Sequence, residues 1–287
     1  MRALSIPPRA LPALAVLLAG ALAYGALCGL LFLRQRSLLY FPQPRAADAP
    51  GELLALPITG GPPGARVLVT VRRRPGPKAL LYFGGNAEDV AWQLPRLEAA
   101  FPDHALYLLH YRGYGGSSGQ PSERALFADA LALFDRVRPD HGQIAVVGRS
   151  LGSAVAVHLA AHRPVDRLVL VTPFDSIEAV AARHYPLVPV GLLLQDKYRS
   201  AAAAPRIGTP TLLIAAERDE VIPRANTDAL LSSFRPGVAS LVVLPVEGHN
   251  AVEDSPRYLP LLQGFLRPDP SGEAPGESPQ PPSRPAS

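Results

Sequence analysis

From residue 79 onward, short strand patterns alternate with helix patterns, and this alternation narrows the possible folds to a few. Each strand candidate is a short run of apolar or β-branched residues, and each helix candidate has apolar residues at helical spacing. Strands that alternate with helices predict a mainly parallel sheet with helices on both faces. We predict strands over 79–83, 105–111, 144–147, 167–171, 211–216 and 241–244, and helices over 87–100, 122–137, 153–161, 224–234 and 253–266.

Two further strands, over 52–56 and 67–71, come before the alternation and have only a turn-rich segment between them. Strands joined without a helix favour an antiparallel start. We therefore expect an α/β fold with a doubly wound, mainly parallel sheet of about eight strands. A longer segment over 173–207, rich in Leu, Val, Ala and Pro, interrupts the alternation and predicts a small cap insertion.

The segment from Gln143 to Ala161 predicts a strand that passes into a helix through one tight turn at Ser150. Gly148 and Gly152 occupy the two positions where side chains would collide across such a turn. The turn strains the serine backbone and points its hydroxyl outward, which is typical of a nucleophile. The alternative is a helix N-cap, for which serine is a preferred residue.

The same pattern, G-x-S-x-G, occurs a second time around Ser117, so the pattern alone is weak evidence. Gln120 and Pro121 follow, and the proline prevents the chain from turning directly into a helix. We interpret Ser117 as part of a flexible loop without a covalent role. The partners of Ser150 must decide its function.

A serine hydroxyl becomes a nucleophile when a base accepts its proton and a carboxylate orients that base. In doubly wound sheets, active groups follow the carboxyl ends of strands. Of the seven histidines, His249 directly follows the last predicted strand and is our candidate for the base. His110 ends a strand and is a minor candidate. The others lie before strands, in a predicted helix or in the insertion: His104, His141, His158, His162 and His184.

The acid is expected after the next-to-last predicted strand, where Glu217, Asp219 and Glu220 lie close together. We choose Asp219, partly because a short carboxylate orients the base more tightly. The alternative is an ordinary charged turn. The chain order Ser150, Asp219, His249 is the nucleophile–acid–base order of one particular fold.

The oxyanion that forms during acyl transfer needs hydrogen-bond donors. The backbone N–H of Leu151, at the predicted start of the helix, is one donor. The loop Gly84-Gly85-Asn86 follows the strand over 79–83, and its glycines allow a close approach of the backbone. We assign the backbone N–H of Asn86 as the second donor. The alternative is an ordinary turn into a helix.

An apolar stretch without charges covers residues 10–33. As a helix rising about 1.5 Å per residue, it is long enough to span hydrocarbon about 30 Å thick. It predicts a single-pass membrane anchor after an N-terminal flank, 1–9. A cleaved signal peptide is the alternative, but apolar sequence continues well past the A-x-A site at Ala21-Leu22-Ala23. Basic residues balance on the two flanks, so charge favours neither orientation.

Composition excludes several other classes. The formal charge is +4, but the arginines are scattered, so we expect no nucleic acid partner. Cys28 is the only cysteine, which excludes an internal disulfide and a CxxC redox pair. Hydrophobic residues make up 48% of the chain, enough for a large core in one domain over 35–267. The Pro-rich tail, 268–287, lacks apolar content and predicts disorder.

Six motifs occur in order over roughly residues 38–267: YFGGNAED, HYRGYGGSSGQPSE, GRSLGS, TPFDSIEAVAARHYP, ERDEVIP and EGHN. This set resembles the α/β-hydrolase superfamily, and within it a membrane-anchored branch similar to the α/β-hydrolase-domain protein depalmitoylases. The resemblance implies an α/β-hydrolase fold in which Ser150 is the nucleophile, Asp219 the acid and His249 the base.

The sequence departs from this family in the oxyanion loop. The family's loop usually reads His-Gly-Asn, and Gly84 stands here at the first position, which leaves the backbone amide of Asn86 in place. The family also often has a glycine where this chain has Ala216. In the Tyr-Arg-Gly-Tyr-Gly loop the family's arginine is structural, which implies a scaffold role for Arg112.

These observations predict a serine hydrolase that cleaves carboxylic ester or thioester bonds through an acyl-serine, without a metal or organic cofactor. The apolar cap favours small-molecule or lipid-like acyl esters, or an acylated protein, as substrates. Two alternatives remain. One is an aminopeptidase-type serine hydrolase, whose acidic pocket would use Asp175 or Asp196. The other is a non-catalytic, membrane-tethered binding module of the same fold.

Overall fold

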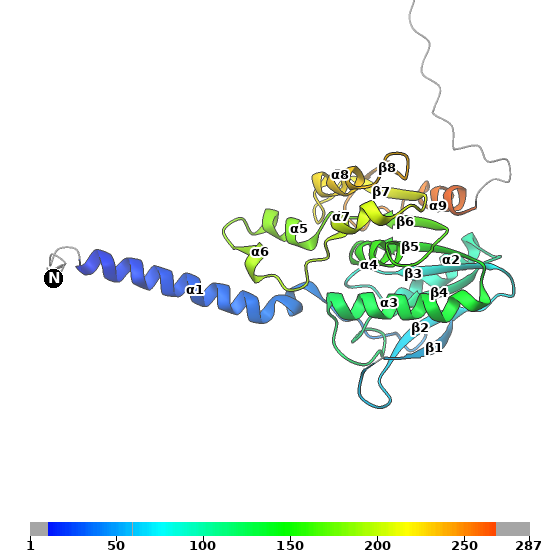
Figure 1. Cartoon of the computed structure of the whole chain (residues 1–287), viewed down its shortest axis with the longest axis horizontal. Helices are drawn as coiled ribbons and strands as arrows, with labels where there is room; N and C mark the ends of the chain where they lie inside the picture. The colour runs from blue at the N-terminus through cyan, green and yellow to red at the C-terminus, as the bar shows by residue number, and fades with distance from the viewer. Residues whose placement is uncertain (1–10, 59, 268–287) are drawn as a thin grey trace, which may run out of the picture.

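The structure is a computed structural model that describes residues 11–58 and 60–267. Its centre is an eight-stranded sheet in the order β1-β2-β4-β3-β5-β6-β7-β8 (Figure 1). Only the pairs β1–β2 and β2–β4 are antiparallel, and the other neighbours run parallel. The strands are β1 Glu52–Pro57, β2 Arg66–Arg72, β3 Lys78–Phe83, β4 Ala105–Leu109, β5 Gln143–Arg149, β6 Arg167–Val171, β7 Thr211–Arg218 and β8 Ala239–Glu247.

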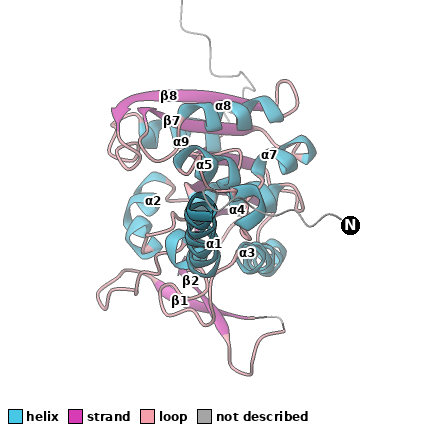
Figure 2. Ribbon diagram, turned by 90° about the vertical axis from the view of Figure 1, so that its left-hand side faces the viewer, coloured by secondary structure: helices cyan, strands magenta, loops and turns pink. Residues whose placement is uncertain are grey.

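Helices cover both faces of this sheet, which confirms the predicted fold class (Figure 2). Buried side chains of α3, α4 and α8 pack on one face, and those of α2 and α9 pack on the other. The α-helices are α1 Leu11–Leu39, α2 Leu94–Ala100, α3 Glu123–Val137, α4 Leu151–Ala160, α5 Ile177–His184, α6 Val190–Leu193, α7 Ser200–Ala203, α8 Arg224–Ser233 and α9 Tyr258–Leu266.

Two predicted helices are shorter than the sequence pattern suggested, and both corrections involve prolines. The helix expected over 87–100 is a 3-10 turn over Val90–Gln93, capped by the Asp89 side chain, followed by α2 with Pro95 in its first turn. The helix expected over 253–266 begins only at Tyr258. Pro256 lies just before it, and a proline disfavours helical backbone at the preceding residue.

Helix α1 projects away from the sheet and extends beyond the predicted boundary at residue 33, ending at Leu39 (Figure 1). Within its 28-residue segment Pro12–Leu39, an 18-residue window reaches a mean hydropathy of 2.3, and none of that window is buried against the rest of the described chain. By length and composition, α1 can cross a membrane. The predicted N-terminal flank (1–9) and the predicted disordered tail (268–287) lie outside the described residues.

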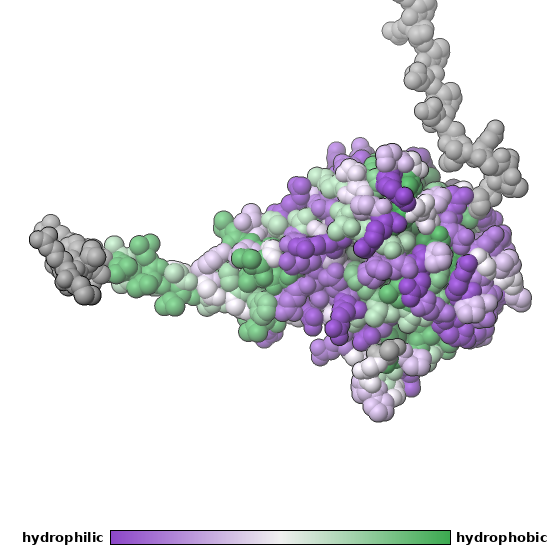
Figure 3. All heavy atoms as spheres, viewed as in Figure 1, coloured by the Kyte–Doolittle hydropathy of each residue, from purple (hydrophilic) through white to green (hydrophobic). Residues whose placement is uncertain are grey.

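The segment between β6 and β7, called the cap here, contains the short helices α5, α6 and α7. Helices α5 and α6 lie beside the C-terminal half of α1 (Figures 1 and 2). Apolar side chains gather both along α1 and over this part of the cap (Figure 3). The cap therefore lies between the projecting helix and the C-terminal edge of the sheet.

Candidate active site

Ser150 lies on the tight turn between β5 and α4, with φ 49° and ψ −117°. A positive φ is costly for a residue with a side chain, so the surrounding structure must hold this turn in place. A Cβ atom on Gly148 would clash with the carbonyl oxygen of Gly152, and one on Gly152 would clash with the carbonyl oxygen of Phe83. The flanking glycines are required because the backbone of the turn and the end of β3 approach each other so closely.

The hydroxyl of Ser150 does not cap α4. The serine occupies the N-cap position, but its side chain makes no capping hydrogen bond within the described chain. Its Oγ instead lies 2.9 Å from Nε2 of His249. The N-cap alternative therefore does not hold, and the hydroxyl is free to exchange a proton with the imidazole.

His249 follows β8 and is held from two sides. Its Nδ1 lies 2.8 Å from Oδ2 and 3.1 Å from Oδ1 of Asp219, while its backbone N–H donates to Oε2 of Glu220 over 3.0 Å. The His249 and Asp219 side chains are 7% and 6% exposed, so this contact is shielded from water. With Ser150, they form one continuous hydrogen-bonded chain from hydroxyl to carboxylate.

Asp219 is the carboxylate of its loop that faces the imidazole, while Glu217 and Glu220 are exposed. Burial is the largest influence on the Asp219 pKa and would raise it. Hydrogen bonds from His249 and from the backbone amides of Ile222 and Val221 outweigh this effect, and the pKa of Asp219 lies below its ordinary value. The carboxylate therefore stays ionised and able to stabilise an imidazolium.

The other histidines serve local structure. His110 is buried and pairs with the hydroxyl of Thr70 at 2.8 Å, and burial lowers its pKa to about 4. His104 and His141 bond to residues near the opposite edge of the sheet. His158 stacks on Phe127, with ring centroids 3.9 Å apart. None of these four has a hydrogen bond to Ser150 in the part of the chain that the structure describes.

Ser117 has a structural role, although its surroundings differ from the expected flexible loop. It is buried, its Oγ accepts a hydrogen bond from the Leu68 amide, and its hydroxyl donates to the carbonyl of His110. These two bonds tie the loop after β4 to β2. The second G-x-S-x-G pattern thus holds a loop against the sheet.

The oxyanion loop after β3 approaches the serine closely. A Cβ placed on Gly85 would lie 3.8 Å from Cβ of Ser150. The Gly85 N–H donates to Oε2 of Glu88 at 2.7 Å, so this amide is engaged. Within residues 11–58 and 60–267, the backbone amides of Asn86 and Leu151 donate to no other protein group. Both predicted donors therefore remain available for an oxyanion.

A buried charged cluster supports three loops of the site, and sequence reasoning missed it. Arg149, the residue before Ser150, lies 3.1 Å from Oε2 of Glu88 and 3.3 Å from Oε1 of Glu253. Its guanidinium also donates to Oδ1 of Asn250, beside His249, at 2.6 Å. Arg149 therefore links the serine turn, the oxyanion loop and the histidine loop.

Burial and the neighbouring charges oppose each other in setting the pKa values of this cluster. Burial would lower the pKa of Arg149, but the carboxylates of Glu253 and Glu88 outweigh it and raise that pKa. Burial raises the pKa of Glu253, although Arg149 opposes the change. The one sequence signal for the cluster was Glu88 in the motif YFGGNAED, because its carboxylate follows the oxyanion loop by two residues.

The remaining candidates have structural partners. The guanidinium of Arg112 donates two hydrogen bonds to Asp129, each 2.8 Å long, which supports its scaffold role. Asp196, a candidate for the acidic pocket of an aminopeptidase, is buried and accepts from Arg36 and Tyr40. Asp175 accepts from the Asn226 amide group. Asp196 is therefore engaged by α1 and the residue after it, which leaves the aminopeptidase alternative with little support.

Comparison with known proteins is consistent with this architecture. Residues 79–189 match the family described as alpha/beta hydrolase fold. A Mycobacterium tuberculosis protein, Rv2307c, is 36% identical over 277 residues, which cover 90% of this chain and 95% of that protein. Alpha/beta hydrolase domain-containing protein 17B of Xenopus tropicalis is 32% identical over 206 residues, covering 68% of this chain and 69% of that one.

Among solved structures, the esterase Pf2001 of Pyrococcus furiosus superposes with a TM-score of 0.62. The match covers 79% of this chain and 97% of the esterase at 14% identity, so it concerns the fold alone. The chain belongs to the α/β-hydrolase superfamily. Its fold and its relatives support a hydrolytic enzyme.

Across 11–58 and 60–267, no three His, Cys, Asp or Glu side chains come close enough together to hold a metal ion. The groups that can move a proton at the site are the hydroxyl of Ser150 and the imidazole of His249.

Proposed function

We propose that this protein is a serine hydrolase that cleaves carboxylic ester or thioester bonds through an acyl-serine intermediate. The observation that carries this proposal is the hydrogen-bonded chain from Ser150 Oγ through His249 to Asp219, built on a turn with positive φ. A hydroxyl beside an oriented imidazole is the arrangement that makes serine nucleophilic.

In the proposed reaction, Ser150 Oγ attacks the acyl carbonyl while His249 Nε2 takes the hydroxyl proton. Asp219 holds the imidazole in the required tautomer and stabilises its positive charge. The proton then passes from His249 to the leaving alcohol or thiol. Water, deprotonated by His249, attacks the acyl-serine and releases the carboxylic acid, and the proton returns to Ser150.

The backbone amides of Asn86 and Leu151 are the proposed oxyanion donors. Leu151 is the first residue of α4, where the N–H has no intrahelical acceptor and the helix dipole favours negative charge. The Asn86 amide follows Gly85, where an added Cβ would lie 3.8 Å from Cβ of Ser150. Such preorganised donors contribute about 3–4 kcal/mol each to transition-state stabilisation in serine hydrolases.

Helix α1 supports a membrane anchor, and the apolar cap beside it supports an acyl substrate. An enzyme held at a bilayer in this way would meet lipid-like esters and acylated proteins. The resemblance to protein depalmitoylases agrees with a thioester of a fatty acid as one substrate class. A cleaved signal sequence is the alternative, but apolar sequence continues well past the A-x-A site at Ala21-Leu22-Ala23, which favours a retained helix.

Labelling with a fluorophosphonate probe tests the reaction class. The full-length protein in detergent is compared with Ser150→Ala and with Ser117→Ala, which alters the serine of the second G-x-S-x-G pattern. We expect labelling of the wild type and of Ser117→Ala and no labelling of Ser150→Ala. A folded wild type that does not react would favour the alternative of a membrane-tethered binding module.

A further inference from the structure

The cap carries an exposed apolar tip. Residues 185–194 read YPLVPVGLLL and contain no charge. Leu187 and Leu192 are 84% and 86% exposed, and Tyr185 is 56% exposed. Arg183 precedes the tip, and after the tip Lys197 is ion-paired with Glu178. Large apolar side chains in contiguous exposed positions mark contact with a membrane or a partner, and the apolar helix α1 beside the tip favours a membrane.

Two hydrogen bonds fix the position of the tip along the axis of α1. The Tyr24 hydroxyl donates to the carbonyl of Leu187 at 2.7 Å, and the Gln35 side chain donates to the carbonyl of Leu193 at 3.2 Å. Along a helix that rises about 1.5 Å per residue, Tyr24 lies about 15 Å from Arg34, the first charge after the apolar stretch. The tip therefore runs beside the apolar part of α1.

A tip in water is incompatible with a membrane-spanning α1. If everything from Tyr24 onward lay in water, the described helix before it would rise only about 20 Å, less than the hydrocarbon thickness of about 30 Å. If α1 spans the bilayer, the apolar tip must lie in the same leaflet as the C-terminal half of α1.

The backbone of the tip is suited to such an environment, in which unpaired polar groups are costly. Pro186 and Pro189 have no N–H to satisfy. The amides of Val188, Val190, Leu192, Leu193 and Leu194 each donate within the tip. Tyr24 and Gln35, two of the polar side chains of α1, satisfy tip carbonyls.

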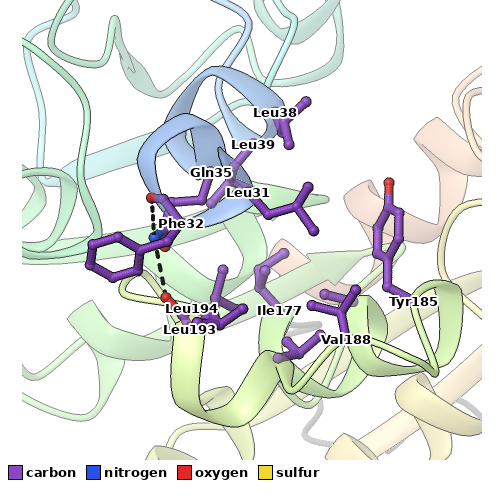
Figure 4. Close-up of a pocket in the computed structure, with 12 residues that line it drawn as sticks. Leu31, Phe32, Gln35, Leu38, Leu39, Ile177, Tyr185, Val188, Leu193 and Leu194 are labelled. Carbon is purple, nitrogen blue, oxygen red and sulfur yellow. Dashed lines mark hydrogen bonds between the residues drawn. The ribbon is translucent and has the colours of Figure 1, made fainter. Parts of the chain in front are cut away.

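An apolar groove of about 150 Å³ lies between α1 and the cap (Figure 4). The side chains of Leu31, Ile177 and Val188 face one another across it, and every lining residue except Gln35 is apolar or aromatic. Its walls are therefore suited to a hydrocarbon chain and offer little to a polar ligand.

The walls of the groove connect with two loops of the active site. Leu39, in the α1 wall, accepts a hydrogen bond through its carbonyl from the Asn86 side chain at 2.9 Å. At the end of α5, His184 contacts the carbonyl of Val221, two residues after Asp219, at 3.1 Å. The two helices that form the groove, α1 and α5, therefore each contact one loop of the candidate active site.

We propose that the tip, residues 185–194, is immersed in the bilayer beside α1 and that the groove takes the acyl chain of an ester or thioester directly from the membrane. This proposal rests on the proposed hydrolase function. The acyl chain enters along Leu31 and Val188, and the ester carbonyl reaches Ser150 while the rest of the substrate stays at the lipid surface.

Immersion is tested without reference to catalysis. In full-length Cys28→Ala protein, Leu187→Cys is labelled with an environment-sensitive fluorophore and reconstituted in phosphatidylcholine vesicles that carry brominated acyl chains. Leu53→Cys on β1, another exposed leucine, is the matched control. We expect strong quenching at position 187 and none at position 53. Equal fluorescence at the two positions in brominated and plain vesicles would overturn immersion.

The groove is tested by chain-length preference. Ala181→Trp fills the groove, whereas Ala182→Trp places the same side chain on the next residue of α5, outside the groove. We expect Ala181→Trp to lower the ratio of palmitoyl to butanoyl ester hydrolysis about tenfold, equivalent to losing the burial of about two methylene groups. Both rates are measured on the same preparation, so any unfolded fraction lowers both rates equally and leaves their ratio unchanged.

The outcomes separate the two proposals. An unchanged ratio in Ala181→Trp, with active wild type, would overturn the groove as the acyl site and leave the hydrolase intact. A shift of equal size in Ala182→Trp would also overturn it. If the labelled Leu187→Cys protein is quenched but the wild type hydrolyses neither ester, the hydrolase would be overturned, and with it the acyl route, while immersion would stand.

Discussion

The side-chain amide of Asn86 donates a hydrogen bond to the carbonyl oxygen of Leu39, 2.9 Å away, which ties the loop beside Ser150 to the last residue of α1. The Asn86 carbonyl in turn accepts from the Phe41 amide and the Tyr114 hydroxyl. The oxyanion loop is therefore supported by the end of the projecting helix, which connects the anchor to the proposed chemistry.

Asn86→Asp should slow the proposed reaction without removing the backbone amide. A carboxylate cannot donate to the Leu39 carbonyl, so the loop loses one hydrogen bond to α1. The backbone N–H of residue 86 is then held less precisely toward the oxyanion. We expect the rate of fluorophosphonate labelling to fall about fivefold, as for the loss of about 1 kcal/mol. Gln43→Glu, which also removes a nearby donor to a backbone carbonyl, is the control and should label at the wild-type rate.

Asp219→Asn should reduce ester turnover about ten-thousandfold, because the amide orients the imidazole in the wrong tautomer. Glu220→Gln keeps an oxygen that accepts from the His249 amide and should change turnover by less than about tenfold. Steady-state rates on a soluble short-chain ester distinguish the two carboxylates. Similar losses in both variants would argue against Asp219 as the orienting acid.

Arg149→Ala should destabilise the fold as well as the site. Arg149 is 12% exposed, and its removal leaves the carboxylates of Glu88 and Glu253 buried without their cation. We expect a loss of about 3–5 kcal/mol in the free energy of unfolding, measured with urea. Arg218→Ala breaks the exposed pair with Glu247 and should cost less than about 1 kcal/mol.

His158 should make stability depend on pH. Burial, with smaller effects from His162 and Arg206, lowers the pKa of His158 to about 4, below the unfolded value of about 6.5. Between these pH values the unfolded chain binds the proton more readily. The stability that the neutral ring contributes is therefore complete above about pH 6.5 and decreases as the pH falls toward 4.

His158→Phe keeps a ring to stack on Phe127 and removes this titration. Urea unfolding near pH 7 and near pH 5 should show a smaller loss of stability at the lower pH for the variant than for wild type. His184→Phe, which changes an exposed ring on α5, is the control and should behave like wild type. The same pH dependence in all three proteins would contradict this assignment.

Local patterns in the sequence were sufficient to predict the fold class and the tight turn at Ser150. Gly148 and Gly152 encode this turn because only glycine fits where the backbones meet, and that constraint acts over five residues. The alternation of strands and helices determined the parallel sheet for the same reason, since each element has its own hydrophobic period. The positions of Asp219 and His249 after strands then predicted where these side chains would lie.

Only the tertiary structure revealed the supports of the site. Arg149 is ion-paired with Glu88, which is 61 residues away in the chain, and with Glu253, which is about 100 residues away. Arg36 is ion-paired with Asp196, which is 160 residues away. No local pattern encodes such pairs, because their energy depends on burial that exists only after the sheet, the cap and α1 have packed together. The contact between the apolar tip and α1 likewise depends on how the cap folds back, which spacing along the chain does not determine.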